Sequence, residues 1–380
     1  MARSLYFAPR TFDLSPGQRL RKINWLMVLT LSAVAGIGFA MLYSVAGGSW
    51  DPWAKNQAIR FGFALVIMIG IALLDLKWLM GLAYPAYAGA LVLLVLVELL
   101  GSSGMGGQRW LDLGLIRIQP SEIMKVAVVL ALAKYFHTLT PETYRHYKHL
   151  IIPVLLIAIP TALVMHQPDL GTAALLALGG LGVIFLAGAR AWIFWAGIIG
   201  GLGAVPFIWR RLMDYQQDRI LTFLNPESDP LGAGYQIIQS KIALGSGGLF
   251  GKGFMQGTQS HLNFLPEMKT DFIFTVLAEE FGLAGGLTLI SLYVILLLYG
   301  LYISVSCRSQ FGRMLAGGLT FILFLYVFIN IGMVTGLLPV VGVPLPLVSY
   351  GGSAMLTVMI AYGLILSVGV QCGVNLARKD

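Results

Sequence analysis

Long apolar runs recur along this 380-residue chain, and polar segments separate them. A helix needs about 20 mostly apolar residues to cross a bilayer, and the runs come near that length. The pattern predicts an all-α integral membrane protein of about ten transmembrane helices, with a long extracytoplasmic loop between helices 7 and 8. The predicted spans are 23–45, 58–75, 77–100, 120–137, 148–166, 169–187, 190–208, 272–304, 312–337 and 350–376.

The same pattern predicts one membrane domain and no separate soluble domain. We expect a cytoplasmic tail at 1–22, a single polytopic domain at 23–376 and a cytoplasmic end at 377–380, with the long extracytoplasmic loop at 209–271. The first apolar run is longer than the roughly 7–15 residues of a signal-peptide core. It therefore predicts an anchor that is not cleaved.

Composition supports a membrane protein. Hydrophobic residues make up 57 % of the chain, charged residues 11 %, and the mean hydropathy is +0.81. A soluble domain has about 25 % charged residues. The net charge of +8 comes largely from short predicted inner loops, which is typical of cytoplasmic loops and places both termini in the cytoplasm. Cys307 and Cys372 fall near that reducing side, so no disulfide is expected.

The segment 265–274 is the strongest candidate for chemistry. It places Glu267 and Asp271 directly before a long apolar helix that carries Glu279 and Glu280. Ionisable residues at membrane depth are costly and therefore functional candidates. Asp271 could act as a general base, or it could only cap the helix. Asp271 and Glu279 would share a helix face, and Glu279 and its neighbour could instead only pair with basic residues of adjacent helices.

Three polar segments, 101–122, 209–271 and 336–353, fall on the same predicted side of the membrane. The third is rich in proline and cannot be regular helix. Non-helical backbone at membrane depth survives where it lines a cavity or is packed in protein. The chain is therefore expected to have a polar cavity that opens outward, and Ser349 is a candidate for binding substrate there.

Basic residues near this cavity predict an anion site. Glu122 and Lys125 form an i, i+3 pair at the outer start of the fourth span. The pair could be a structural ion pair, or Lys125 could bind an anionic substrate group while Glu122 orients it. Arg60, Arg109 and Arg117 fall on the same side, where they could bind phosphate oxygens or reach toward headgroups. The set would suit a pyrophosphate leaving group.

Other motifs have simpler interpretations. Asp169 is predicted to cap the sixth span. The glycine-rich run 245–257 lacks the spacing and the strand of a phosphate-binding loop. The segment 234–244 is typical of a short amphipathic helix, which could lie on the membrane or cover the cavity. His146 and His149 are expected to be solvated, and no spacing typical of metal ligands is found.

These segments resemble the SEDS family (shape, elongation, division and sporulation) of bacterial peptidoglycan polymerases, in order along nearly the whole chain. The resemblance is closer to the elongation member, RodA, than to the division member, FtsW. One departure is Lys269, where relatives often carry a histidine before the threonine. The matching motifs are QRWLD at 108–112, QPSE at 119–122 followed by Lys125, PDLGT at 168–172, GYQ at 234–236, GSGG at 245–248, LPE at 265–267, TDFIF at 270–274, AEE at 278–280, GLLP at 336–339 and SYGGS at 349–353.

The resemblance implies a glycosyltransferase of cell wall biogenesis that acts during cell elongation, on the outer face of the bacterial cytoplasmic (inner) membrane. The substrate would be lipid II, joined into β-1,4 glycan strands, with undecaprenyl pyrophosphate as leaving group. Asp271 matches the family's essential acid and would be the general base. Lys125, oriented by Glu122, and the outer arginines would offset charge on the leaving group. A divalent cation, Mg2+ or Mn2+, could share that task, although no ligand set is readable.

The resemblance also implies partners. A class B penicillin-binding protein, a transpeptidase, would dock on transmembrane helices 8 and 9, within the elongation machinery, and no nucleic acid is involved. A lipid II flippase and a pure scaffold are alternatives. A flippase needs access from both sides, whereas the polar groups crowd the outer side. A scaffold leaves the clustered acids and arginines without a role.

Overall fold

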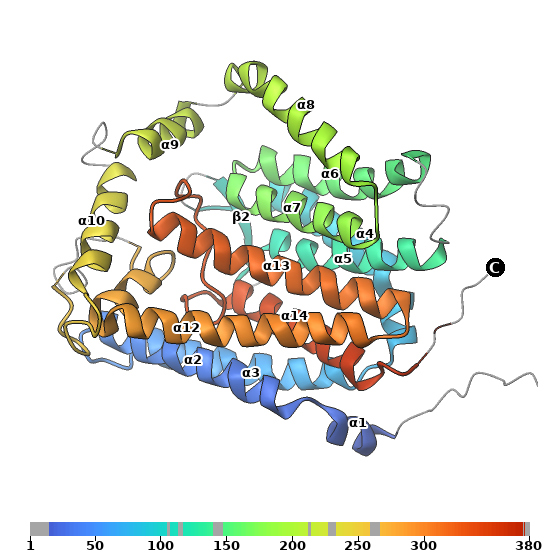
Figure 1. Cartoon of the computed structure of the whole chain (residues 1–380), viewed down its shortest axis with the longest axis horizontal. Helices are drawn as coiled ribbons and strands as arrows, with labels where there is room; N and C mark the ends of the chain where they lie inside the picture. Colours follow the sequence, from blue (N-terminus) through green and yellow to red (C-terminus); the bar gives the residue numbers. More distant parts are fainter. Residues whose placement is uncertain are drawn as a thin grey trace, which may run out of the picture.

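The computed structural model describes residues 15–104, 107–112, 117–139, 147–211, 214–226, 233–258, 267–374 and 376. Helices lying side by side make up most of this part of the chain (Figure 1). They are α1 (Pro16–Lys22), α2 (Trp25–Val45), α3 (Trp53–Ala72), α4 (Leu76–Leu100), α5 (Pro120–Thr138), η2 (Tyr147–Leu150), α6 (Ile151–His166), α7 (Leu170–Leu186), α8 (Ala191–Trp209), α9 (Asp214–Leu224), α10 (Ala233–Ser246), α12 (Ile273–Ser306), α13 (Gln310–Val334) and α14 (Gly352–Val370).

A helix occupies each predicted span, with ends shifted by a few residues. Seven helices in the described part are long and apolar enough to cross a bilayer, namely α2, α3, α4, α6 with its preceding turn, α12, α13 and α14. The helices α7 and α8 are apolar but shorter, and α5 carries Glu122, Lys125 and Lys134. The all-α membrane class is confirmed. The number of crossings and the domain limits stay predictions, and 1–14 and 377–380 lie outside the described residues.

The first polar segment contains short strands, which its loop-like composition did not predict. They are β1 (Ser102–Gly104), β2 (Gly107–Asp112) and β3 (Arg117–Ile118), antiparallel in the order β1-β2-β3. Ser103 pairs with Gln108, and Leu111 pairs with Ile118. Strands this short satisfy their backbone groups by local pairing, so hydropathy carries little signal for them.

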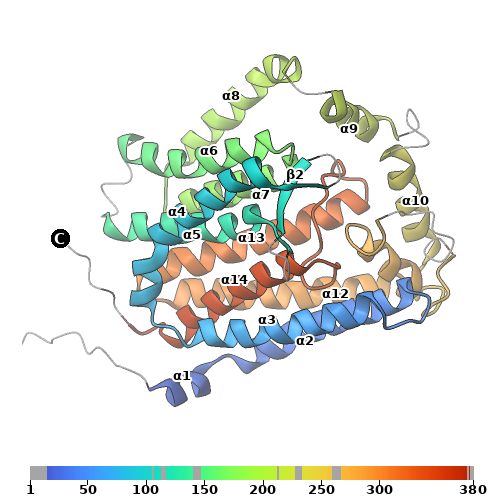
Figure 2. The same ribbon diagram turned by 180° about the vertical axis from the view of Figure 1, so that it is seen from behind.

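The core of the bundle is formed by α5, α13 and α14, whose side chains are mostly buried. Helix α14 packs against α3, α5 against α4, and α13 against α12, α7 and α5. Small residues allow this close approach, as is common between membrane helices. At Gly363 of α14, a Cβ would come within 2.8 Å of the Met68 carbonyl oxygen of α3. Figure 2 shows α3 and α14 side by side from behind.

Helix α8 lies at the edge of the molecule, apart from the main bundle, with α9 leading from it to α10 (Figures 1 and 2). Large apolar side chains are exposed on it, among them Trp192, Trp195, Ile199 and Leu202. Such a helix has no polar face that could lie against water. Lipid contact is therefore what its composition requires.

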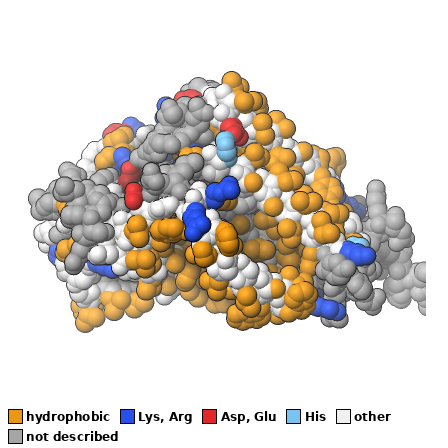
Figure 3. Space-filling model, turned by 90° about the horizontal axis from the view of Figure 1, so that it is seen from above, with side chains coloured by type: hydrophobic (Ala, Val, Ile, Leu, Met, Phe, Trp, Pro, Cys, Tyr) orange, Lys and Arg blue, Asp and Glu red, His pale blue; other side chains and the backbone are white. Residues whose placement is uncertain are grey.

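Hydrophobic side chains cover much of the described surface, with few charges between them (Figure 3). Exposed leucine, isoleucine, valine and aromatic side chains occur on α2, α3, α4, α6 and α12 as well. A soluble monomer rarely exposes large contiguous apolar patches. The surface thus supports a multi-pass membrane protein.

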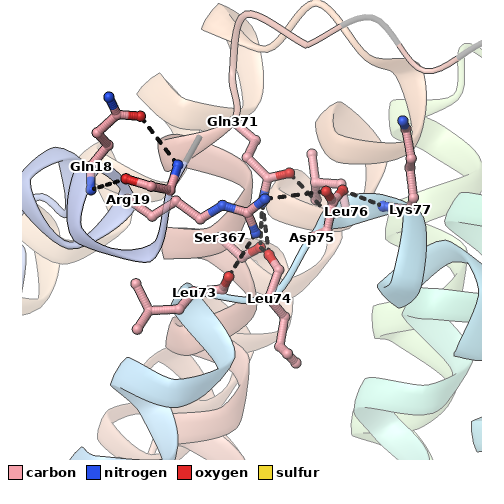
Figure 4. Close-up of polar contacts among 10 residues, drawn as sticks. Gln18, Arg19, Leu73, Leu74, Asp75, Leu76, Lys77, Ser367 and Gln371 are labelled. Carbon is pink, nitrogen blue, oxygen red and sulfur yellow. Dashed lines mark hydrogen bonds and ion pairs between the residues drawn. The ribbon is translucent and has the colours of Figure 1, made fainter. Parts of the chain in front are cut away.

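One end of the bundle is tied together by polar contacts around the turn between α3 and α4 (Figure 4). Arg19 of α1 donates to the Leu73 carbonyl at 2.8 Å and pairs with Asp75 at 3.3 Å. Gln371, after α14, donates to the Leu74 carbonyl at 2.7 Å and accepts from the Leu76 N–H at 3.1 Å. These bonds satisfy backbone groups at the end of α3 and the start of α4, so side chains from α1 and from the segment after α14 hold this turn in place.

Candidate active site

Asp271 lies at the opposite end of the bundle, in a turn before α12. The turn closes through backbone bonds from the N–H groups of Thr270 and Phe272 to the Glu267 carbonyl, at 3.2 and 3.3 Å. Helix α12 begins at Ile273, and Phe272 occupies the N-cap position without a side-chain cap bond. Asp271 therefore precedes the assigned N-cap position by one residue, and the helical face of Glu279 begins with Thr275.

Buried groups fix the backbone of Asp271. Asn330, fully buried in α13, donates to the Asp271 carbonyl at 2.9 Å and to the Val343 carbonyl at 2.7 Å. Its amide thus joins α13, the turn before α12 and the proline-rich segment. A Cβ on Gly342, whose φ is +74°, would lie 3.5 Å from Oδ2 of Asp271. The half-buried carboxylate therefore faces that segment, where a Cβ would be in ordinary van der Waals contact and the positive φ of Gly342 favours glycine.

Ser349 supports the same turn. Its hydroxyl donates to the Thr270 carbonyl at 2.5 Å and accepts from the Leu345 N–H at 2.7 Å. The Tyr350 N–H donates to the Lys269 carbonyl at 2.8 Å. Ser349 is buried, so in this structure it positions the Asp271 turn. Its predicted role in binding substrate stays a prediction.

Gln57 of α3 extends this support. Its amide Nε2 donates to the Ser349 carbonyl at 2.8 Å, and its Oε1 accepts from the Gly351 N–H at 3.4 Å. Two cations stand nearby on aromatic rings. Arg60 lies over the Tyr350 ring and Lys269 over the Trp53 ring. Glu267 belongs to the same turn, where its Oε2 accepts from Thr270 Oγ1 at 2.8 Å. The structure thus brings Asp271, Ser349, Arg60 and Glu267 together at one end of the bundle.

Glu122 and Lys125 form a buried cluster with Tyr326 of α13. Lys125 Nζ lies 2.7 Å from Glu122 Oε1, and the Tyr326 hydroxyl donates to Glu122 Oε2 at 2.5 Å. Lys125 also bonds to that hydroxyl, and its side chain is only 1 % exposed. This is the geometry of a structural ion pair within α5 that is joined to α13 through Tyr326, one of the two alternatives that the sequence left open. Substrate binding by the pair stays a prediction.

Arg109 and Arg117 also have protein partners. Arg109 donates to the Gln167 carbonyl at 3.1 Å and to the Pro168 carbonyl, and it lies 3.8 Å from Asp169. Asp169 accepts from the Thr172 N–H at 3.1 Å, which confirms it as the cap of α7. Arg117 pairs with Asp112 at 3.0 Å across β2 and β3. Both arginines therefore have local partners, Arg117 with a side chain that is 73 % exposed, and their predicted binding of substrate stays a prediction.

Glu279 and Glu280 are paired as well. Glu279 accepts from Lys252 Nζ at 2.8 Å and from Thr258 at 3.2 Å, and Glu280 accepts from the Ser44 hydroxyl. The pairing alternative is thus supported for Glu279, although its partner comes from the loop after α10. Glu279 is buried beneath that partner, so a part in binding substrate stays a prediction.

The glycine-rich run has a structural explanation. Residues 247–253 form backbone hydrogen bonds with α12 on both sides of a kink at Gly282, including Lys252 N–H to the Glu279 carbonyl at 3.0 Å. A Cβ on Gly247 or Gly251 would collide with α12 carbonyl groups. The glycines therefore permit close backbone packing, consistent with the rejection of a phosphate-binding loop.

Three site residues were missed from the sequence: Lys269, Asn330 and Gln57. Asn330 had a readable signal, since an amide inside an apolar span needs partners. Among the described residues, no group of three or more His, Cys, Asp or Glu could hold a metal ion. A part for Mg2+ or Mn2+ stays a prediction, because magnesium is usually held by one or two carboxylates together with substrate phosphates.

Fold and site together define a polytopic helical membrane protein with a carboxylate held at one end of the bundle. Residues 21–372 match the family described as cell cycle protein, FtsW/RodA/SpoVE. The chain belongs to this family. It is 48 % identical to peptidoglycan glycosyltransferase MrdB of Escherichia coli K12 over 344 residues, which cover 90 % of this chain and 92 % of that protein. It is 36 % identical to stage V sporulation protein E of Bacillus subtilis over 355 residues, covering 90 % and 95 %.

Solved structures agree. A chain from work described as the structural coordination of polymerization and crosslinking by a peptidoglycan synthase complex matches with a TM-score of 0.80 at 33 % identity, covering 91 % of this chain and 97 % of that one. The rod shape determining protein RodA of Thermus thermophilus matches with a TM-score of 0.69 at 29 % identity, covering 92 % and 97 %. The SEDS resemblance is therefore confirmed.

Proposed function

We propose that the chain is a peptidoglycan glycosyltransferase that joins lipid II units into β-1,4 glycan strands, with Asp271 as general base. One observation carries the proposal: the Asp271 carboxylate is half-buried on a backbone that Asn330 and Ser349 fix from two other segments. The relatives named peptidoglycan glycosyltransferase support the activity.

The reaction is a displacement at the anomeric carbon of the donor MurNAc. Asp271 accepts the proton of the acceptor's GlcNAc 4-hydroxyl as its oxygen attacks. The new C–O bond forms while the bond to diphosphate breaks, and undecaprenyl pyrophosphate leaves with the electron pair. Since the diphosphate leaves as a stabilised anion, nearby positive charge assists it more than a general acid would. A base on a fixed backbone keeps the geometry of attack.

Glu122 and Lys125 fit this mechanism as positioning residues. They hold Tyr326, which lies one helical turn from Asn330 on α13. Residues four apart share a helix face, so the ion pair fixes the part of α13 whose amide binds the Asp271 carbonyl. This assignment needs no substrate contact by either charge.

The proposed topology places the Asp271 end outside the cytoplasmic membrane and the Arg19 end inside, with both termini in the cytoplasm. The partner would be a class B penicillin-binding protein whose transmembrane segment lies on α12 and α13. Exposed apolar side chains on α12 (Leu298, Leu301) and α13 (Phe324, Phe328) support this surface. The likeness to a synthase complex that coordinates polymerization and crosslinking supports such a partner.

The test is polymerisation of labelled lipid II by the purified chain in vesicles, alone and with the transpeptidase. The proposal predicts long glycan strands. A flippase would instead carry lipid II across the bilayer without strands, and a scaffold would do neither while still binding the transpeptidase. Either outcome would contradict the proposal.

A further inference from the structure

Two cations beside Asp271 have aromatic partners. The guanidinium carbon of Arg60 lies 5.0 Å from the Tyr350 ring centroid, and Lys269 Nζ lies 5.0 Å from the Trp53 centroid. Within the described ranges, neither cation forms an ion pair with a carboxylate. The other basic residues predicted to bind pyrophosphate all have one: Lys125, Arg109 and Arg117.

The backbone fixes these cations relative to each other. Trp53, Gln57 and Arg60 follow one face of α3 at spacings of four and three residues, so the backbones of Trp53 and Arg60 are about 10 Å apart along the helix. The same face holds the proline-rich segment through Gln57, and the Tyr350 N–H binds the Lys269 carbonyl. Lys269 and Asp271 are two residues apart in one turn. Both charges thus flank the backbone that carries the base.

Aromatic partners leave the charge of a cation available. A ring attracts a cation by about 0.5–1 kcal/mol at an exposed site, but it does not neutralise the charge. Arginine keeps its forked N–H donors and lysine its ammonium donors for another acceptor. A Cβ on Gly352 would lie 3.4 Å from the Arg60 Nε, so glycine there leaves room around the guanidinium. The arrangement orients two cations that remain able to bind an anion.

We propose that Arg60 and Lys269 form the diphosphate-binding subsite of this enzyme, which takes the diphosphate of a polyprenyl-linked sugar. The proposal rests on the proposed function and adds Lys269 to it. When the glycosidic C–O bond of a bound donor breaks, the electron pair passes to the diphosphate oxygen, and the two cations offset the added negative charge. The same chemistry would hold the diphosphate that an acceptor lipid retains.

Direct binding tests the subsite without turnover. The protein in nanodiscs is titrated with undecaprenyl diphosphate, and bound lipid is counted by native mass spectrometry. Lys269→Gln and Arg60→Gln should each weaken binding about tenfold, the size of a charge-assisted contact. The same two substitutions should weaken the binding of undecaprenyl monophosphate by a smaller factor. Lys55→Gln is the matched control, since Lys55 lies exposed on the same helix and pairs with Asp51 at 3.1 Å.

Charge-keeping variants separate binding from folding. Lys269→Arg and Arg60→Lys should retain most of the affinity that the glutamine variants lose. Equal affinity of the wild type and the Lys269→Gln/Arg60→Gln variant would overturn the subsite. If that happens while the wild type polymerises lipid II, the proposed function stands alone. If the affinity falls as expected but no strands form, the subsite stands and the proposed function fails.

Kinetics then identify the source of the diphosphate. Lipid II whose GlcNAc 4-hydroxyl is blocked can act only as donor. A raised KM for this donor in Lys269→Gln, at saturating acceptor, would assign the subsite to the leaving diphosphate. A raised KM for the acceptor alone would assign it to the diphosphate that the acceptor keeps. An unchanged KM for both would contradict the subsite.

Discussion

The buried pair of Glu122 and Lys125 allows a structural role to be tested against direct substrate binding. Lys125→Met removes the ammonium and leaves the Glu122 carboxylate buried beside Tyr326. The charged atoms lie 2.7 Å apart, a separation at which unit charges attract by about 6 kcal/mol at an effective dielectric constant of ~20. Desolvation offsets part of this, so removing one partner of a buried pair costs about 3–5 kcal/mol.

The assay is unfolding of the purified variants in one detergent, followed by circular dichroism. Lys125→Met should lower the free energy of unfolding by about 3–5 kcal/mol. Adding Glu122→Gln should recover most of that loss, because no unpaired charge stays buried. Lys134→Met is the control on the same helix. Lys134 lies over the Tyr84 ring at 4.5 Å, a contact worth about 0.5–1 kcal/mol at an exposed position.

One result would refute this reasoning. If Lys125→Met unfolds within about 1 kcal/mol of the wild type but loses polymerisation, Lys125 faces an open aqueous site. The substrate-binding alternative would then replace the structural one.

Three further predictions concern other parts of the chain. Gly282→Ala should destabilise by about 1–3 kcal/mol, since Gly282 has a φ of +66° and a Cβ there would collide with the 247–253 loop; Gly89→Ala, with open space around it, is the control in the same unfolding assay. Burial, with the neighbouring Cys372 thiol, raises the pKa of Cys307 to about 11. At pH 8 about one Cys307 in a thousand is then thiolate, so alkylation read by mass spectrometry should be slow and should accelerate as pH rises toward 11; labelling at the rate of a free cysteine at pH 8 would contradict the burial. EDTA should leave the melting temperature unchanged, because the described residues include no metal-ligand group, and a fall would point to a structural ion.

Hydropathy predicted the helices because the side chains of each apolar run must be buried in protein or lie in lipid. That requirement is the same however the helices pack against one another. Hydropathy could not predict the turn that carries Asp271. That turn depends on Asn330 and Ser349, which lie 59 and 79 residues from the carbonyls they bind. The local rule for a helix N-cap therefore misplaced Asp271 by one residue.

The candidate anion site shows the same limit. The sequence placed several basic residues on one predicted side of the membrane, and Arg109 contacts the 167–169 segment, far from it in the chain. Only the i, i+3 pair of Glu122 and Lys125 could be read locally. The position of Lys269 over Trp53 depends on how α3 meets the Asp271 turn. The only sequence signal for Lys269 was that it stands where relatives often carry a histidine.

Strand synthesis by Asp271→Asn tests the central claim most directly. Wild type, Asp271→Asn and Asp51→Asn are compared on labelled lipid II with the transpeptidase partner, at matched folding by circular dichroism. Asp51 is exposed and pairs with Lys55 at the same end of the bundle, which makes it the matched carboxylate. Asp271→Asn is expected to lose about 10²–10⁴-fold in rate, the usual contribution of a general base, while Asp51→Asn keeps the wild-type rate. Wild-type strand synthesis by a folded Asp271→Asn protein would contradict that claim.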